Sequence, residues 1–209
     1  MGPAEGFAGF GIGNTGARFR GGGDWSSAIV NMDSPVGVST EEGSVSVWFK
    51  RDAGVRESPE ILWFAGDEMA DGFGPEPEMN IFVAESGRVQ FFIENGEKDV
   101  LLSSSRPSGD GRWHHVVASW GDEAVSLSID GELVARDAET RQTQQRLFRG
   151  REVRIGKTGL GSLPGKAKMT WFDGMMDEVA LWDRALTAEE VARQFAAGLG
   201  DTSKISNMR

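Results

Sequence analysis

The sequence of 209 residues contains no cysteine and no tyrosine, and only two histidines. Without cysteine the chain has no disulfide bond, no thiolate nucleophile and no cysteine-bound metal. No apolar run approaches the roughly 20 residues that a transmembrane helix needs, so insertion into a membrane as a helix is excluded. Basic residues are the minority, because 22 Lys and Arg face 32 Asp and Glu, which gives a net charge of −10. This balance argues against nucleic acid as a partner.

The N-terminal residues Met-Gly-Pro-Ala-Glu-Gly-Phe lack the basic region and the apolar core of a secretory signal. Either a signal has been removed, or the protein leaves the cell by another route. Residues 1–16 are rich in Gly and Ala and are expected to form an arm that is ordered when it docks on a partner. Such an arm offers a contact for a homo-oligomer or a larger assembly. We expect one domain over 17–198 and a short tail over 199–209.

Short apolar runs separated by turn residues dominate the chain. In residues 43–51, Val45, Val47 and Phe49 alternate with polar or amphipathic residues, a pattern that is typical of a strand with one apolar face. Asp130-Gly131 predicts a tight turn after the strand at 125–129. Further strands are expected at 17–20, 25–32, 60–65, 79–84, 88–93, 99–103 and 152–156. About a dozen strands in all predict an all-β, two-sheet antiparallel jelly-roll sandwich with one short C-terminal helix.

The stretch 172–186 reads Phe-Asp-Gly-Met-Met-Asp-Glu-Val-Ala-Leu-Trp-Asp-Arg-Ala-Leu. It predicts a strand with two largely apolar faces, with residues 176, 178, 180 and 182 on one face and residues 175, 177, 179 and 181 on the other. A helix is expected to follow, with Thr187 as N-cap, Glu190 as its capping-box partner and Gly198 as the stop signal.

This ending resembles the closing segment of the laminin-G-like jelly rolls of the concanavalin A-like superfamily, whose pattern is close to F-D-G-x-I-D-E-V-x-I-Y-N-R-A-L-S-x-E-E-I. Residues 110–135 resemble a second family segment, G-x-W-H-H-V-A-x-T-Y-D followed by x-L-x-V-D-G-x-L-V. The resemblance covers about 17–198 and implies the sandwich fold. It does not specify what the domain binds.

Asp24 and Asp177 are the candidate metal ligands. Calcium prefers carboxylate and carbonyl oxygens, which a Gly-rich turn beside an aspartate can provide. The resemblance implies a structural calcium, since many superfamily members bind one through the aspartate that corresponds to Asp177. An aspartate that only hydrogen-bonds a turn is the alternative. The adjacent pair His114 and His115 would point to opposite faces of a strand and cannot share one ion, so packed or hydrogen-bonded histidines are expected.

The seven tryptophans are the candidate sugar-stacking residues. Trp25, Trp63 and Trp171 lie near expected strand ends or loops and are the candidate ligand-binding residues. The other four, Trp48, Trp113, Trp120 and Trp182, are expected in the core. The absence of tyrosine removes the second residue type that usually stacks on sugars.

Catalytic residues are not expected. Retaining glycosidases need two carboxylates about 5 Å apart, which laminarinase-type relatives supply from E-x-D-x-x-E on one strand. That triple does not occur, and neither does G-x-S-x-G. The sequence therefore predicts a non-catalytic recognition module for carbohydrate or a protein surface, stabilised by calcium, at an extracellular, cell-surface or virion-surface location. A structural or assembly subunit, such as a decoration, spike or adhesion module, is the alternative, and a polysaccharide-active enzyme comes third.

Overall fold

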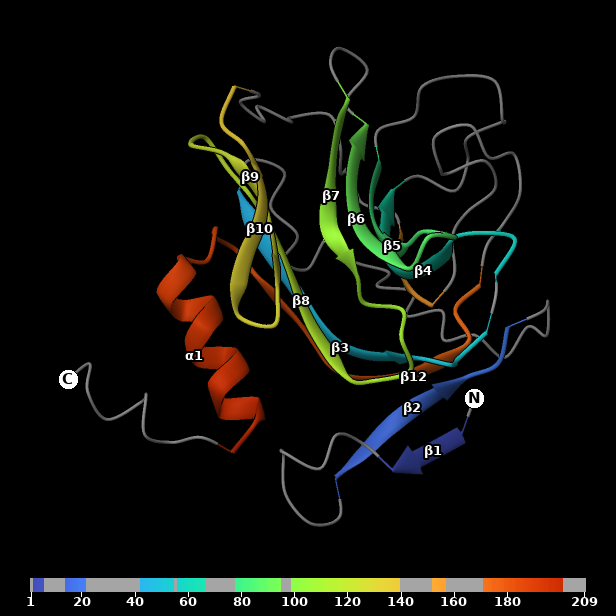
Figure 1. Cartoon of the computed structure of the whole chain (residues 1–209). Helices are drawn as coiled ribbons and strands as arrows, with labels where there is room; N and C mark the ends of the chain where they lie inside the picture. The colour runs from blue at the N-terminus through green and yellow to red at the C-terminus, as the bar shows by residue number, and fades with distance from the viewer. Residues whose placement is uncertain are drawn as a thin grey trace.

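Figure 1 shows the computed structural model of the chain, a two-layer sandwich with a single helix on the outside of one layer. The structure describes residues 2–5, 14–21, 42–54, 56–66, 78–94, 99–139, 152–156 and 171–200. The expected strand at 25–32 lies outside these residues. The described residues contain no helix long and apolar enough to span a membrane.

One layer is a seven-stranded antiparallel sheet. Its strands, in spatial order, are β1 (Gly2–Glu5), β2 (Thr15–Phe19), β12 (Gly174–Trp182), β3 (Gly43–Arg51), β8 (His114–Trp120), β9 (Val125–Ile129) and β10 (Glu132–Asp137). β1 lies within the expected N-terminal arm and pairs with β2 at the edge of this sheet. The strand from the end of the chain, β12, therefore lies inside the sheet, as its two apolar faces predict.

The other layer is a five-stranded antiparallel sheet with the order β11 (Glu152–Ile155), β4 (Glu60–Gly66), β5 (Glu78–Val83), β6 (Arg88–Glu94) and β7 (Val100–Pro107). The main core fills the space between the two sheets. Every second residue of a strand points into this core. In β3 these residues are Val45, Val47 and Phe49, which are all fully buried. The expected all-β jelly-roll sandwich is thus confirmed.

β12 departs from the expected alternation. Its pairing with β3 shifts register between Asp177 and Ala180, and Glu178 takes a positive φ of 47°. Met176 faces the main core before this bulge, whereas Val179 and Leu181 pack against the core after it. A bulge inserts an extra residue and so exchanges the two faces of a strand. The prediction of one unbroken alternation through 182 was wrong for this reason.

The helix α1 (Ala188–Gly198) lies against the outer side of the seven-stranded sheet, near β8 and β10 (Figure 1). The predicted start is confirmed: Thr187 is the N-cap and forms a capping box with Glu190. The helix ends at Gly198 as predicted, but Gly198 is its last helical residue and not the left-handed residue that closes it. Leu199 is the C-cap, and Gly200, with φ of 73°, donates its N–H to the carbonyl of Ala197. Gly200 therefore provides the left-handed residue that closes the helix.

Candidate functional site

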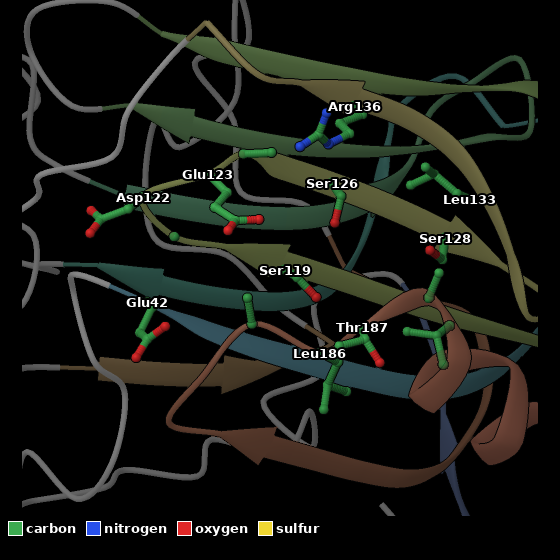
Figure 2. A pocket seen from close by; sticks show the side chains of 15 residues that line it. Glu42, Ser119, Asp122, Glu123, Ser126, Ser128, Leu133, Arg136, Leu186 and Thr187 are labelled. Atoms are coloured by element: carbon green, nitrogen blue, oxygen red, sulfur yellow. The ribbon is translucent and has the colours of Figure 1, made fainter. Parts of the chain in front are cut away.

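A groove of about 640 Å³ lies on the outer face of the seven-stranded sheet, beside the start of α1 (Figure 2). Its floor is formed by β8, β9 and β10. Alternation along β9 explains the polar floor, because Val125, Leu127 and Ile129 enter the core while Ser126 and Ser128 face the groove. The turn after β9 has positive φ at both Asp130 and Gly131, as expected for a two-residue type I′ hairpin turn.

A row of polar residues crosses the floor. In the pairing registers, Ser44 of β3 lies opposite Ser119 of β8, Ser119 opposite Ser126 of β9, and Ser126 opposite Arg136 of β10. The Ser44 hydroxyl lies 2.8 Å from the Ser119 hydroxyl. In the segment that leads into α1, it donates to the Arg184 carbonyl and accepts from the Leu186 N–H, each at 2.9 Å. The row therefore connects the floor of the groove to its helical wall.

Ser128 occupies the floor next to this row. The residue is 6% exposed and lines the groove, and its hydroxyl forms no hydrogen bond within the described part of the chain. Buried hydroxyls are normally paired with protein or water. The Ser128 hydroxyl is therefore open to a partner from the groove, either water or a ligand group.

The wall beside α1 is rigidly built. Leu186 and Val191 pack on Val117 of β8, so the first turn of the helix is fixed to the sheet. Arg184 donates two hydrogen bonds to the Glu190 carboxylate, at 2.8 and 2.6 Å, and these hydrogen bonds lower the pKa of Glu190 to about 2. Glu190 is thus ionised at any physiological pH, and it completes the cap at the same time.

Charged side chains stand around the floor. The lining contains three acidic residues, Glu42, Asp122 and Glu123, and one basic residue, Arg136, which lies opposite Ser126 in the strand register. Figure 2 shows the Glu123, Ser126 and Arg136 side chains among those that line the groove. Asp122, Glu123 and Arg136 form no ion pair in the described part of the chain. The groove can therefore offer hydroxyls, carboxylates and one guanidinium to a polar ligand.

The two histidines are the first residues of β8, and of the two only His115 has a ring contact with α1 among the described residues. The Asp130 carboxylate lies 2.7 Å from Nδ1 of His114, and the Asp110 carboxylate lies 3.0 Å from Nε2 of the same ring. Burial lowers the pKa of His114, but these two carboxylates outweigh it and raise the pKa above its usual value. His115 stacks with Trp48 of β3 and Phe195 of α1, and burial lowers its pKa to about 4. Both histidines are packed or hydrogen-bonded, as the sequence predicts.

The raised pKa of His114 makes a testable prediction. Its imidazolium stabilises the fold fully below the unfolded-state pKa of about 6.5, and this contribution is lost as the pH rises through the higher folded-state pKa. We expect the His114→Gln variant to lose more free energy of unfolding at pH 6 than at pH 9. Urea denaturation of both proteins at the two pH values measures this difference, and equal losses would contradict it.

The predicted ligand-binding tryptophans have different outcomes. Trp63 has no exposed surface and packs against Trp120, with ring centroids 6.4 Å apart, so the prediction was wrong for this residue. The register of β4 shifts between Ile61 and Trp63, and this bulge places Leu62 and Trp63 together in the main core. Trp171 is half-buried and stays a prediction. Trp25 lies outside the described residues.

Of the two predicted metal ligands, Asp24 lies outside the described residues. Asp177 is buried at the bulge of β12, where its carboxylate accepts hydrogen bonds from the Asn14 amide at 2.5 Å and from the Glu178 N–H at 2.9 Å. The described residues contain no group of three acidic or histidine side chains that could hold a metal ion. Calcium prefers six to eight oxygen ligands, so Asp177 and Asn14 do not by themselves suffice for this ion.

The groove residues were missed by sequence reasoning. The alternation of Ser126 and Ser128 with apolar neighbours indicates a polar outer face, but it does not indicate that the helix leaves this part of the face uncovered. Only the packing of α1 on one end of the sheet creates the wall that makes the face a groove.

A two-sheet jelly roll with one helix on its outer face and a polar groove beside that helix is a lectin-like architecture. A laminin-G family model, described as the concanavalin A-like lectin/glucanases superfamily, matches residues 21–192. The chain belongs to this superfamily.

Similar proteins agree with this assignment. The adhesion G-protein coupled receptor D1 of Homo sapiens is 22% identical over 88% of this chain, which covers only 20% of the receptor's length. The Ruminococcus gnavus IT-sialidase CBM40, solved with α2,3-sialyllactose, superimposes with a TM-score of 0.63 at 15% identity over 86% of this chain and 96% of its own. A heptameric SAP-like pentraxin from Limulus polyphemus gives 0.57 at 15% identity over 84% and 78%. These structural likenesses show the shared fold.

Proposed function

We propose that this chain is a non-catalytic recognition module that binds carbohydrate in the groove over β8, β9 and β10. The observation that carries the proposal is the hydroxyl of Ser128, a residue that is largely buried, lines the groove and hydrogen-bonds no described residue through this group. A sugar hydroxyl both donates and accepts, as a serine does, so it can pair with Ser128 and Ser126 together. A volume of about 640 Å³ lies within the usual range for ligand sites.

Several features support a binding role over catalysis. The groove carboxylates Glu42, Asp122 and Glu123 flank the ends of β3 and β8, and do not project from alternate positions of one strand. Glu60, another buried carboxylate, is held by Arg51 and Arg56. The carbohydrate ligand of the similar CBM40 module supports carbohydrate as the ligand class. We place the module outside the cell or at its surface, because the similar receptor is an adhesion receptor by name.

The Ser128→Ala variant tests the site directly. Removing a hydroxyl that has no protein partner leaves the free energy of unfolding within about 0.5 kcal/mol of the parent. Loss of one hydrogen bond to the ligand weakens glycan binding by about three- to tenfold. A glycan-array screen of the parent protein identifies the ligand, and calorimetry on both proteins then measures the change in affinity.

The screen is run with calcium and with EDTA, because we also propose that Asp177 contributes to a structural calcium site together with groups outside the described residues. Binding that requires calcium would support that site, whereas equal binding in both buffers would argue against a calcium requirement. A blank array in both buffers would overturn the carbohydrate proposal. A protein surface, or the role of an assembly subunit that docks through its N-terminal arm, would then be the next function to test.

A further inference from the structure

The groove has a charge pattern that selects among carbohydrates. Resting on the proposed function, we propose that it binds a glycan whose sugars carry a free, protonated amine, in preference to neutral or carboxylate-bearing sugars. The proposal combines the acidic lining with the unbonded Ser128 hydroxyl on the floor of the same groove.

Acidic residues outnumber basic ones both in the groove lining and in the whole chain. Glu42, Asp122 and Glu123 face the groove against the single Arg136, and the whole chain carries a net charge of −10. Asp122 and Glu123 have no basic partner in the described part of the chain, so none of the described residues neutralises their charges. A ligand amine would supply the missing counter-charge, while a sugar carboxylate would be repelled.

The arrangement of the floor fits a sugar that also carries an amine. Ser126 and Ser128 share the outer face of β9, and Glu123, which precedes this strand in the chain, also lines the groove (Figure 2). A sugar ring that hydrogen-bonds these two hydroxyls would hold a ring substituent near the Glu123 carboxylate. An ammonium group at that position gains a charge-assisted hydrogen bond. An acetylated amine there keeps the sugar hydroxyls but loses the charge.

Besides Arg136, the groove lining offers an anionic ligand one candidate anchor, the N-terminus of α1. The capping box of the helix already occupies part of it. The first turn of a helix attracts anions through its unpaired N–H groups. In α1 the Thr187 side chain accepts from the Glu190 N–H at 3.2 Å, and the Glu190 carboxylate accepts from the Thr187 N–H at 2.9 Å. Glu189 adds a further negative charge to this turn. The capping box therefore occupies part of this N-terminus, and the two carboxylates of the first turn disfavour a third.

The test uses two ligands that differ only in their acetyl groups: the β-1,4-linked tetramer of glucosamine and the tetramer of N-acetylglucosamine. Calorimetry at pH 6 and low salt measures both affinities with the intact chain. We expect the glucosamine tetramer to bind at least about tenfold more tightly, because several charge-assisted contacts replace neutral ones. The preference should shrink as salt is added, since exposed charges are screened.

A matched pair of variants separates the groove from the acidity of the whole protein. Glu123→Gln removes one charge inside the groove and should reduce the preference for the glucosamine tetramer by about three- to tenfold. Glu139→Gln removes the same charge from an exposed residue that does not line the groove, and should leave the preference unchanged. Equal losses in both variants would show non-specific attraction and overturn the inference.

Failure of the inference can be distinguished from failure of the proposed function. If the two tetramers, or an acidic glycan such as sialyllactose, bind equally well and Ser128→Ala weakens them all, the groove binds carbohydrate without selecting an amine. If neither tetramer binds and the array is blank, the proposed function fails together with the inference.

Discussion

The Gly174→Ala variant is expected to lose about 3 kcal/mol or more of the free energy of unfolding. Gly174 begins β12 and pairs with Phe19 of β2 on one side and with Arg51 of β3 on the other. A Cβ at this position would lie 2.2 Å from the Lys50 carbonyl oxygen and 3.0 Å from the Arg51 Cα. Both atoms belong to the backbone of β3, so the strands themselves would have to separate.

Urea denaturation followed by tryptophan fluorescence measures this loss. Gly121→Ala is the matched control, because a Cβ there would meet its nearest neighbour, the Glu42 Cβ, at an ordinary 3.4 Å. We expect that control to change the free energy of unfolding by no more than about 0.5 kcal/mol. Equal losses in the two variants would mean that β12 can shift to make room, and would contradict the expectation.

The Glu60→Gln variant is expected to lose about 3–5 kcal/mol, because it leaves a buried guanidinium without its counter-charge. Glu60 and Arg51 form an ion pair whose side chains are only 5% and 3% exposed. The second carboxylate oxygen of Glu60 accepts hydrogen bonds from the Arg56 side chain and from the Asp173 N–H, each at 3.2 Å. One carboxylate thus links β3 and β4 to the segment that enters β12.

Two comparisons test the explanation of that loss. The double variant Arg51→Met/Glu60→Leu replaces the whole pair with apolar side chains and should recover most of the stability that Glu60→Gln loses. Asp52→Asn breaks the Arg18–Asp52 pair, whose side chains are about one-third exposed, and should cost at most about 1 kcal/mol. A double variant as unstable as Glu60→Gln would show that the pair itself, and not the uncompensated charge, provides the stability.

Local patterns predicted the strands and the helix start well. The nine residues of β3 match the expected range because Val and Phe alternate with Ser and Lys without interruption. The capping box of α1 was predictable because Thr187 and Glu190 are three residues apart, and the hydrogen bonds between them depend on nothing distant. The positive-φ turn at Asp130-Gly131 followed from the two residues alone.

Two of the errors involve bulges. The second half of β12 was assigned to the wrong face because a bulge shifts the register of that strand, and a bulge in β4 places Trp63, which was expected near a strand end, in the main core. A bulge is set by how a strand pairs with its neighbours, and these are distant in the sequence. Alternation read along one strand therefore cannot locate it.

The sequence by itself determined the all-β sandwich, the capped helix at its end and the superfamily, because these follow from local spacing and from motifs that span few residues. Tertiary structure alone decided where the candidate site lies. The groove exists because α1 covers the face around Val117 and leaves the hydroxyls of Ser126 and Ser128 open beside it. The position of α1 on the sheet depends on its contacts with β8, which lies some seventy residues earlier in the chain. No local sequence pattern encodes such contacts.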